Sequence, residues 1–221
     1  MLEHNRLLKF DDNSYVHFVT TGTFRNLPYF RNEECCRVLL EELKYYSDKL
    51  DFTLPGYVIM PDHIHLLLWW DKTGKSDLSI SRIIQAIKGT TARRIINLTT
   101  SGRLEHLLRA ASDTVPKNSK SHKQNIKYHL WKRGFYDFNI YTEEKLAEKL
   151  NYVHNNPVRA GLASAPGDYR WSSYKLYFGT STLGESISSP YIALGADAPR
   201  YPAGADAPRH ARFRRFMEIV R

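Results

Sequence analysis

The stretch that decides the fold is 52–70, FTLPGYVIMPDHIHLLLWW. It holds two runs rich in β-branched, aromatic and aliphatic residues, at 52–60 and 63–70, and such runs predict β-strands. Only Pro61-Asp62 separates them, and this dipeptide is typical of a tight turn. The stretch therefore predicts an antiparallel hairpin whose first strand is interrupted at Pro55-Gly56.

Segments before and after the hairpin predict further elements. The run SYVHFVTT at 14–21 reads as a strand. Asn32 is suited to cap a helix that continues to about Leu50, with Glu33 and Glu34 in its first turn. After the hairpin, 79–98 has isoleucines at helical spacing mixed with Lys and Arg, which predicts an amphipathic helix with a basic outer face.

The C-terminal half predicts one more strand region and one more helix. WKRGFYDFNI at 131–140 supplies one or two short strands. Thr142 starts a helix that Pro157 is expected to end, since the residue before a proline avoids helical geometry. The order β-α-β-β-α-β-α with antiparallel neighbours predicts an α+β fold, with a sheet of four or five strands and helices mainly on one face.

Length and composition set the broad class. A chain of 221 residues with 14 Tyr, 10 Phe and 4 Trp can build a core, which excludes disordered and fibrous classes. We expect one domain over 1–178 and a low-complexity basic tail over 179–221, where GADAPR occurs twice. The longest apolar run is far shorter than the roughly 20 residues that span a bilayer. Adjacent Cys35 and Cys36 are expected to be reduced, in a cytoplasmic protein without a signal peptide.

The charge distribution is the first pointer to a partner. The chain carries 32 Lys and Arg against 23 Asp and Glu, a net charge of +9. Between 72 and 133 there are fourteen Lys and Arg and only three acids, a local balance of +11. Such a basic block is typical of proteins that bind nucleic acids, although a solvated basic face would have the same composition.

Two histidines stand in the apolar run 63–70. Residues two apart in a strand project from one face, so His63 and His65 point one way and Ile64 points into the core. Two imidazoles on one strand face form half of a metal site. Most such pairs bind nothing, but two histidines in HIHLLLWW are costly to bury without a role.

A second group of polar residues lies at 152–157, YVHNNP. Tyr152 and Asn156 are one helical turn apart and therefore share a face. Leu150 and Val153 mark the buried side of that helix, which leaves Tyr152 at its border. An ordinary surface tyrosine before an Asn-Pro helix stop would have the same pattern, so this segment alone decides nothing.

Several motifs of the chain, taken together, form a pattern that is far more specific than any one of them alone. MPDHIHLLL, the basic helix ISRIIQAIKGTTARRI, WKRGFYD, YVHNNPVRAGL and WSSY occur in this order between 14 and 174. The set resembles the REP-associated tyrosine transposases, which are insertion-sequence-200-like, single-tyrosine HUH nucleases. The resemblance implies a ferredoxin-like antiparallel sheet with the histidine pair on a central strand. Two positions differ from the usual pattern, because Phe138 stands where a histidine is usual and Tyr141 where an arginine is usual.

The resemblance also implies roles for residues. His63-Ile64-His65 would be the HUH motif, Tyr152 the nucleophile and Asn156 the third metal ligand. It implies magnesium or manganese as the cofactor, although the ligand types alone would equally admit zinc. A phenol, with a pKa of about 10, reaches its anion at far lower cost than a serine hydroxyl. Attack on single-stranded or hairpin DNA would leave a 5′-phosphotyrosine and a free 3′-hydroxyl.

Basic side chains of the helix and of the segments after it are expected to contact DNA: Arg82, Lys88, Arg93, Arg94, Lys117, Lys120, Lys123, Lys127, Lys132 and Arg133. Four aromatic residues are equally consistent with base stacking and with core packing: Tyr128, Trp131, Phe135 and Tyr136. Three further histidines are expected at the surface or in secondary positions, not as ligands: His122, His129 and His154.

The leading hypothesis is a single-strand DNA endonuclease and strand transferase that acts as a monomer or homodimer. A non-catalytic relative that binds DNA hairpins is the alternative, and a small metal-dependent hydrolase with another substrate is a third. The concentrated positive charge and the lack of a second acidic cluster in the sequence argue against the hydrolase.

Overall fold

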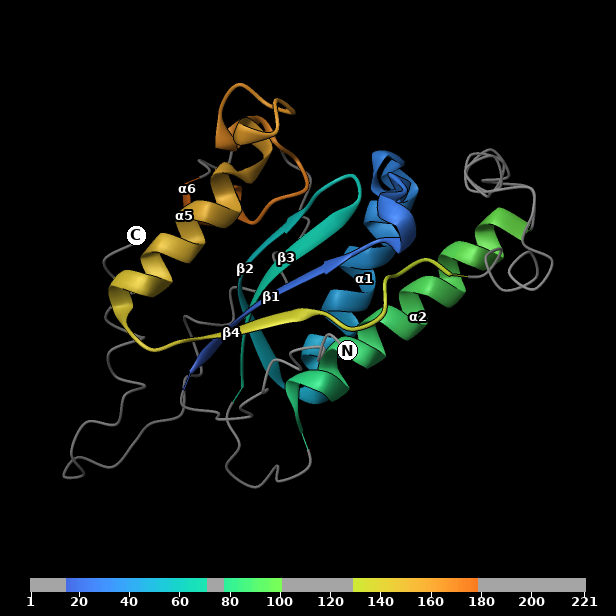
Figure 1. Cartoon of the computed structure of the whole chain (residues 1–221), viewed down its shortest axis with the longest axis horizontal. Helices are drawn as coiled ribbons and strands as arrows, with labels where there is room; N and C mark the ends of the chain where they lie inside the picture. Colours follow the sequence, from blue (N-terminus) through green and yellow to red (C-terminus); the bar gives the residue numbers. More distant parts are fainter. Residues whose placement is uncertain (1–14, 71–77, 101–128, 179–221) are drawn as a thin grey trace, which may run out of the picture.

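The computed structural model describes residues 15–70, 78–100 and 129–178, and its centre is an antiparallel sheet (Figure 1). The sheet has four strands in the order β2-β3-β1-β4. The strands are β1 (Val16–Gly22), β2 (Phe52–Ile59), β3 (His63–Trp70) and β4 (Tyr136–Ile140). The long helices are α1 (Glu33–Leu50), α2 (Ile80–Thr100) and α5 (Glu143–Arg159). This order confirms the predicted α+β antiparallel class.

Helices cover both faces of the sheet (Figure 1). On one face α1 and α2 pack against residues that include Val19, Ile64 and Leu66. On the opposite face α5 packs against Phe18 and Leu67. Two long helices therefore share one face, as expected, and the third lies alone on the other. Because side chains alternate along a strand, β3 turns His63 and His65 toward the α5 face.

Local sequence signals explain where the elements begin and end. The Asn32 side chain accepts hydrogen bonds from the backbone N–H groups of Glu34 and Cys35, as its capping role predicts. Cys35 and Cys36 are free and buried within α1, and burial raises the pKa of each thiol to about 12. None of the helices in the described ranges is long and apolar enough to cross a membrane.

The predicted hairpin is present, and its irregularity has a clear position. β2 pairs antiparallel with β3, with Ile59 opposite Ile64, and the register shifts between Thr53 and Gly56. The shift spans the predicted interruption at Pro55, which has no N–H for the ladder. The strand continues across it, so Pro55-Gly56 deforms β2 without ending it.

Pro157 does not end α5, and this expectation was wrong. The helix runs through Pro157 to Arg159, and the N–H groups of Ala160 and Leu162 donate to the carbonyls of Asn156 and Pro157. Proline removes one helical hydrogen bond, and so close to the end of the helix the following turn still closes normally. The expected tail at 179–221 lies outside the described residues.

Gly56 lets α5 approach β2. A Cβ built on Gly56 would lie 2.8 Å from Leu150 Cδ1 and 3.0 Å from Leu67 Cδ1, both in the buried core. We expect Gly56→Ala to lower the free energy of unfolding by about 1–3 kcal/mol, since overpacking forces the leucines or α5 to shift. Urea denaturation followed by circular dichroism measures the change.

Gly89 is the matched control for that substitution. It lies in the middle of α2, and a Cβ there would meet nothing within 4 Å. Gly89→Ala should raise the free energy of unfolding by up to about 1 kcal/mol, because alanine is the better helix former. Equal stability of the two variants would contradict close packing at Gly56.

Candidate active site

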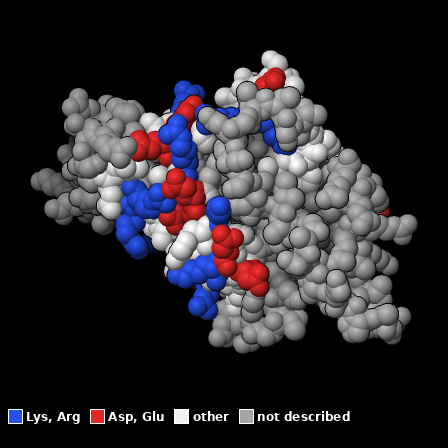
Figure 2. All heavy atoms as spheres, turned by 180° about the vertical axis from the view of Figure 1, so that it is seen from behind, with Lys and Arg blue, Asp and Glu red and all other residues white. Residues whose placement is uncertain are grey.

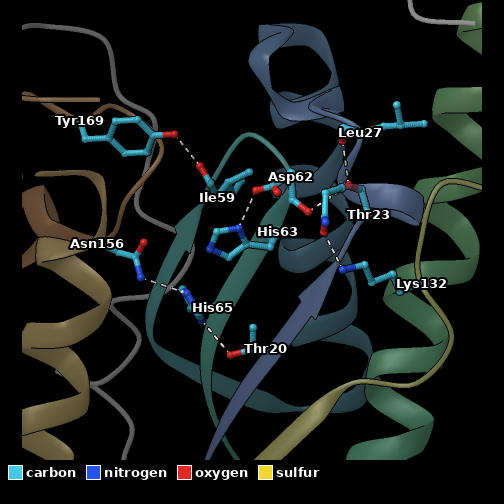
Figure 3. Close-up of polar contacts among 11 residues, drawn as sticks. Thr20, Thr23, Leu27, Ile59, Asp62, His63, His65, Lys132, Asn156 and Tyr169 are labelled. Carbon is cyan, nitrogen blue, oxygen red and sulfur yellow. Dashed lines mark hydrogen bonds and ion pairs between the residues drawn. The ribbon is translucent and has the colours of Figure 1, made fainter. Parts of the chain in front are cut away.

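Two histidines from β3 and Asn156 from α5 meet on the α5 face of the sheet (Figure 3). Tyr152, also from α5, contacts His65. β3 pairs with β1 so that His63 lies opposite Gly22 and His65 opposite Thr20. The two imidazole centroids are 4.9 Å apart. The prediction that both side chains share one face is confirmed, and Ile64 lies in the core on the other face.

Each imidazole is held through its Nδ1 atom (Figure 3). His63 Nδ1 is 2.7 Å from Asp62 Oδ1, and His65 Nδ1 is 2.8 Å from Thr20 Oγ1. A carboxylate only accepts hydrogen bonds, so the His63 proton sits on Nδ1 and leaves the Nε2 lone pair available. A partner on the second nitrogen is the usual way in which a metal-binding histidine is oriented.

His65 is neutral at ordinary pH. Burial, reinforced by electrostatic interactions with His63 and Lys149, lowers the pKa of His65 to about 3. An imidazole binds a metal ion through a neutral nitrogen, so this environment keeps His65 in its ligand form.

Tyr152 and Asn156 approach His65 from α5. Asn156 Nδ2 lies 3.1 Å from His65 Nε2. The ring centroid of Tyr152 lies 5.2 Å from that of His65, with the planes at 74°. Tyr152 is half-buried, between buried Val153 and the exposed helix surface, as the spacing predicted. The structure thus brings together all four residues expected to form the site.

The donor set fits a divalent cation. Among the residues that the structure describes, no three His, Cys, Asp or Glu side chains gather as a possible metal site. A cation held by Nε2 of His63 and Nε2 of His65 would replace the hydrogen bond between His65 Nε2 and Asn156 Nδ2, and it would need the amide oxygen of Asn156 as its third ligand. By ligand type alone, two imidazole nitrogens and an amide oxygen suit zinc better than magnesium. Manganese accepts both nitrogen and oxygen ligands.

Two of the predicted DNA-binding cations are engaged within the fold. The Lys88 ammonium donates to Thr21 Oγ1 at 3.1 Å and to the carbonyls of Lys132 and Gly134 at 2.8 and 2.6 Å. Arg94 donates to Glu42 at 2.8 Å and also to Glu41. Both come from α2, on the face opposite to the histidine pair. Their contacts join α2 to the strand region and to α1. These two side chains of the predicted basic face therefore help to stabilise the fold.

The remaining predicted cations are differently placed. Arg82, Arg93 and Arg133 are exposed, and Lys132 donates to the side chain of Asn26 near the start of β3. Among the described residues on the face seen in Figure 2, acidic and basic side chains interleave. Four predicted lysines lie outside the described residues: Lys117, Lys120, Lys123 and Lys127.

Sequence reasoning missed several residues around the site. Lys149 Nζ lies 5.7 Å from the ring centroid of Tyr152, and Arg159 Cζ lies 5.8 Å from it. The helical spacing of Lys149, three positions before Tyr152, was a usable signal. A second usable signal was that Asp62 is adjacent to His63 in the sequence. Thr20 and Phe18 had no such signal, because strand pairing alone brings them to His65.

His154 is buried and takes a secondary position, the second of the two places expected for it, whereas His129 is exposed. His154 Nε2 lies 2.9 Å from Ser173 Oγ in the WSSY segment. Ser173 Oγ also accepts a hydrogen bond from the N–H of Tyr57 at 2.9 Å in β2. Through this hydroxyl, WSSY fastens α5 to the edge of the sheet, a structural role that the sequence did not indicate.

Comparison with known proteins agrees with this architecture. Residues 11–109 match the model of the family described as "Transposase IS200 like". A Haemophilus influenzae protein named as a REP-associated tyrosine transposase is 27% identical over 135 residues, 59% of this chain. The chain spans 64% of the length of that relative, just under two thirds.

Two solved structures are also similar. One, of a REP-associated tyrosine transposase bound to a REP hairpin, has a TM-score of 0.57 and 15% identity, covering 91% of this chain and 98% of that chain. The other, a transposase structure from Deinococcus radiodurans, has a TM-score of 0.41 and 18% identity, covering 70% of this chain and 97% of that chain.

Over residues 11–109 the chain is therefore similar to the IS200-like transposases. In sequence the chain is also similar to a REP-associated tyrosine transposase, and the resemblance predicted from its motifs is confirmed.

Proposed function

We propose that this protein is a metal-dependent single-strand DNA endonuclease and strand transferase that cleaves at or near DNA hairpins. The observation that carries the proposal is the 5.2 Å ring contact of Tyr152 with His65, whose Nε2 also meets Asn156 at 3.1 Å. A phenol beside neutral metal-type ligands is suited to transesterification at phosphorus. The relationship to transposases supports the same chemistry.

Tyr152 is the proposed nucleophile. Its oxygen forms a bond to phosphorus while the bond between phosphorus and the 3′ oxygen breaks. The phenol loses its proton and the departing 3′ oxygen gains one, giving a 5′-phosphotyrosine and a free 3′-hydroxyl. The new link conserves the phosphodiester, so attack by another 3′-hydroxyl rejoins a strand without a nucleotide cofactor.

His63, His65 and Asn156 would hold the cation, magnesium or manganese, and Asp62 and Thr20 would orient the two rings. When bound, such an ion polarises phosphate oxygens and stabilises negative charge on the departing oxygen. The three ligands are neutral, so they add no charge that would repel the phosphate.

The proposed partner is single-stranded or hairpin DNA. A similar solved protein is bound to a REP hairpin, and this chain has a net charge of +9. All four site residues come from one chain, so we propose that a monomer is sufficient for cleavage. We place the protein in the cytoplasm, where free cysteines such as Cys35 and Cys36 persist.

Tyr152→Phe should abolish the covalent adduct and leave DNA binding intact, because only the attacking oxygen is lost. The test incubates the protein with manganese and a labelled hairpin that has single-stranded flanks. A denaturing gel then detects a protease-sensitive adduct, and a native gel detects binding. Tyr45→Phe, an exposed tyrosine of α1, is the matched control. An undiminished adduct in Tyr152→Phe would overturn the assignment, and retarded complexes without an adduct in the wild type would favour the non-catalytic hairpin binder.

His65→Ala should abolish metal-dependent nicking, because it removes both a proposed ligand and the partner of Asn156. Nicking of the same hairpin is measured in chelator-treated buffer to which manganese is added back. His129→Ala is the matched control, since His129 is exposed. Normal nicking by His65→Ala would contradict the ligand role.

A further inference from the structure

The α5 side of edge strand β4 carries an exposed tyrosine in line with the active site. Thr20 of β1 pairs with His65 of β3 on one side and with Tyr136 of β4 on the other, so these residues form one row across the sheet. Two strand spacings separate His65 from Tyr136, roughly 10 Å. At this separation, neighbouring nucleotides of one DNA strand can lie at His65 and at Tyr136.

Aromatic contacts form a continuous surface between His65 and Tyr136. The Phe18 ring stacks on His65 at 5.5 Å and meets the edges of Tyr152 at 5.9 Å and Tyr136 at 6.4 Å. Phe18 is only 5% exposed and forms the floor, whereas Tyr136 is 44% exposed. An aromatic surface therefore leads from the nucleophile to the open edge of the sheet.

Lys149 adds a positive charge above this surface. Its Nζ lies 5.1 Å from the ring centroid of Phe18 and 5.7 Å from those of Phe138 and Tyr152. The side chain is 22% exposed, and its carboxylate neighbour, Glu148, is 3.6 Å away and 56% exposed. Glu148 also pairs with Lys145 at 2.6 Å. A long pair with a solvated, shared carboxylate leaves Lys149 able to attract another anion.

We propose that Tyr136 and Lys149 form a nucleotide subsite beside the cleavage position, where an unpaired base stacks on Tyr136 and its phosphate contacts Lys149. Tyr136 and Lys149 both neighbour the Phe18 ring. Aromatic rings that stack on bases, combined with cations that contact phosphates, are the groups that bind single strands. Of the aromatic candidates within the described residues, Trp131 and Phe135 pack with the α1–α2 core instead. The inference rests on the proposed function and extends it to the strand that flanks the cut.

The chain contains a matched control pair on the other side of the sheet. Tyr45 of α1 is 51% exposed, and Lys49 Nζ lies 5.2 Å from its ring centroid. The pair has the same two residue types, but it belongs to α1, which packs on the face opposite to α5.

The experiment measures binding in the Tyr152→Phe background, where no cleavage interferes. The probe is a fluorescent DNA hairpin with single-stranded thymidine flanks, and anisotropy gives Kd over a series of salt concentrations. Tyr136→Ala should weaken binding at least about fivefold with an unchanged salt slope, since a stacked base contributes about 1–3 kcal/mol. Lys149→Gln should make the slope of log Kd against log salt shallower by about 0.7, the share of one phosphate on a single strand, and Lys149→Arg should restore it.

Tyr136→Phe should keep the parent affinity, because it retains the ring, and Tyr45→Ala and Lys49→Gln should change neither quantity. Parent-like affinity in Tyr136→Ala, an equal loss in Tyr45→Ala, or an unchanged slope in folded Lys149→Gln would overturn the subsite. Circular dichroism shows that each variant is folded. The adduct assay on wild-type protein tests the proposed nuclease separately. If the Tyr136 and Lys149 variants show the expected binding changes but the wild type forms no adduct, the subsite stands and the nuclease activity is rejected. If the wild type forms the adduct but the variants bind like the parent, only the subsite is rejected.

Discussion

The hydrogen bond between Asn156 and His65 is the contact on which the rest of the site depends, because it joins α5 to the central strand β3. One half of the site lies on the sheet and the other on a helix that begins 73 residues after β3 ends. Tyr152 meets His65 only if α5 lies at one height and one rotation on the sheet. The docking of α5 is therefore a requirement of the chemistry as well as of the fold.

Three features hold α5 in that position. Leu150 and Val153 bury its apolar side against the sheet, which sets its rotation. Gly56 lacks a side chain where Leu150 lies against β2, which sets how closely the helix approaches. Ser173 binds both His154 of the helix and the backbone of β2, which fastens the active-site end of α5 to the sheet edge. The site is thus positioned by core packing and by one buried hydroxyl.

The two faces of the sheet have different tasks. The α1–α2 face holds the larger apolar core, and there Arg94 pairs with Glu41 and Glu42 across the two helices. The α5 face carries the imidazoles, the phenol and the Phe18–Tyr136 surface. This division explains why a helix that is basic in sequence contributes partly to stability, while Lys149 on another helix lies next to the proposed nucleophile.

Sequence periodicity predicted most elements and showed which of the four candidate residues share a face, because alternation along β3 and the four-residue spacing of Tyr152 and Asn156 are local properties. It could not show that Arg94 meets acids more than fifty positions away, or that Thr20 meets His65, since both depend on tertiary pairing. The Pro157 rule failed because a proline in the last turn disturbs little that follows it. His154 is buried where α5 meets Ser173 of the WSSY segment. No periodic pattern in the sequence indicates the role of that segment.

A crystal of the wild-type protein soaked in manganese, with anomalous scattering to locate the ion, tests the central claim most directly. The account predicts one manganese ion between Nε2 of His63 and Nε2 of His65, with the Asn156 side chain as a further ligand and the Tyr152 hydroxyl turned toward the ion. An ion bound elsewhere, or a Tyr152 hydroxyl on the far side of α5 with no partner subunit supplying another, would contradict it.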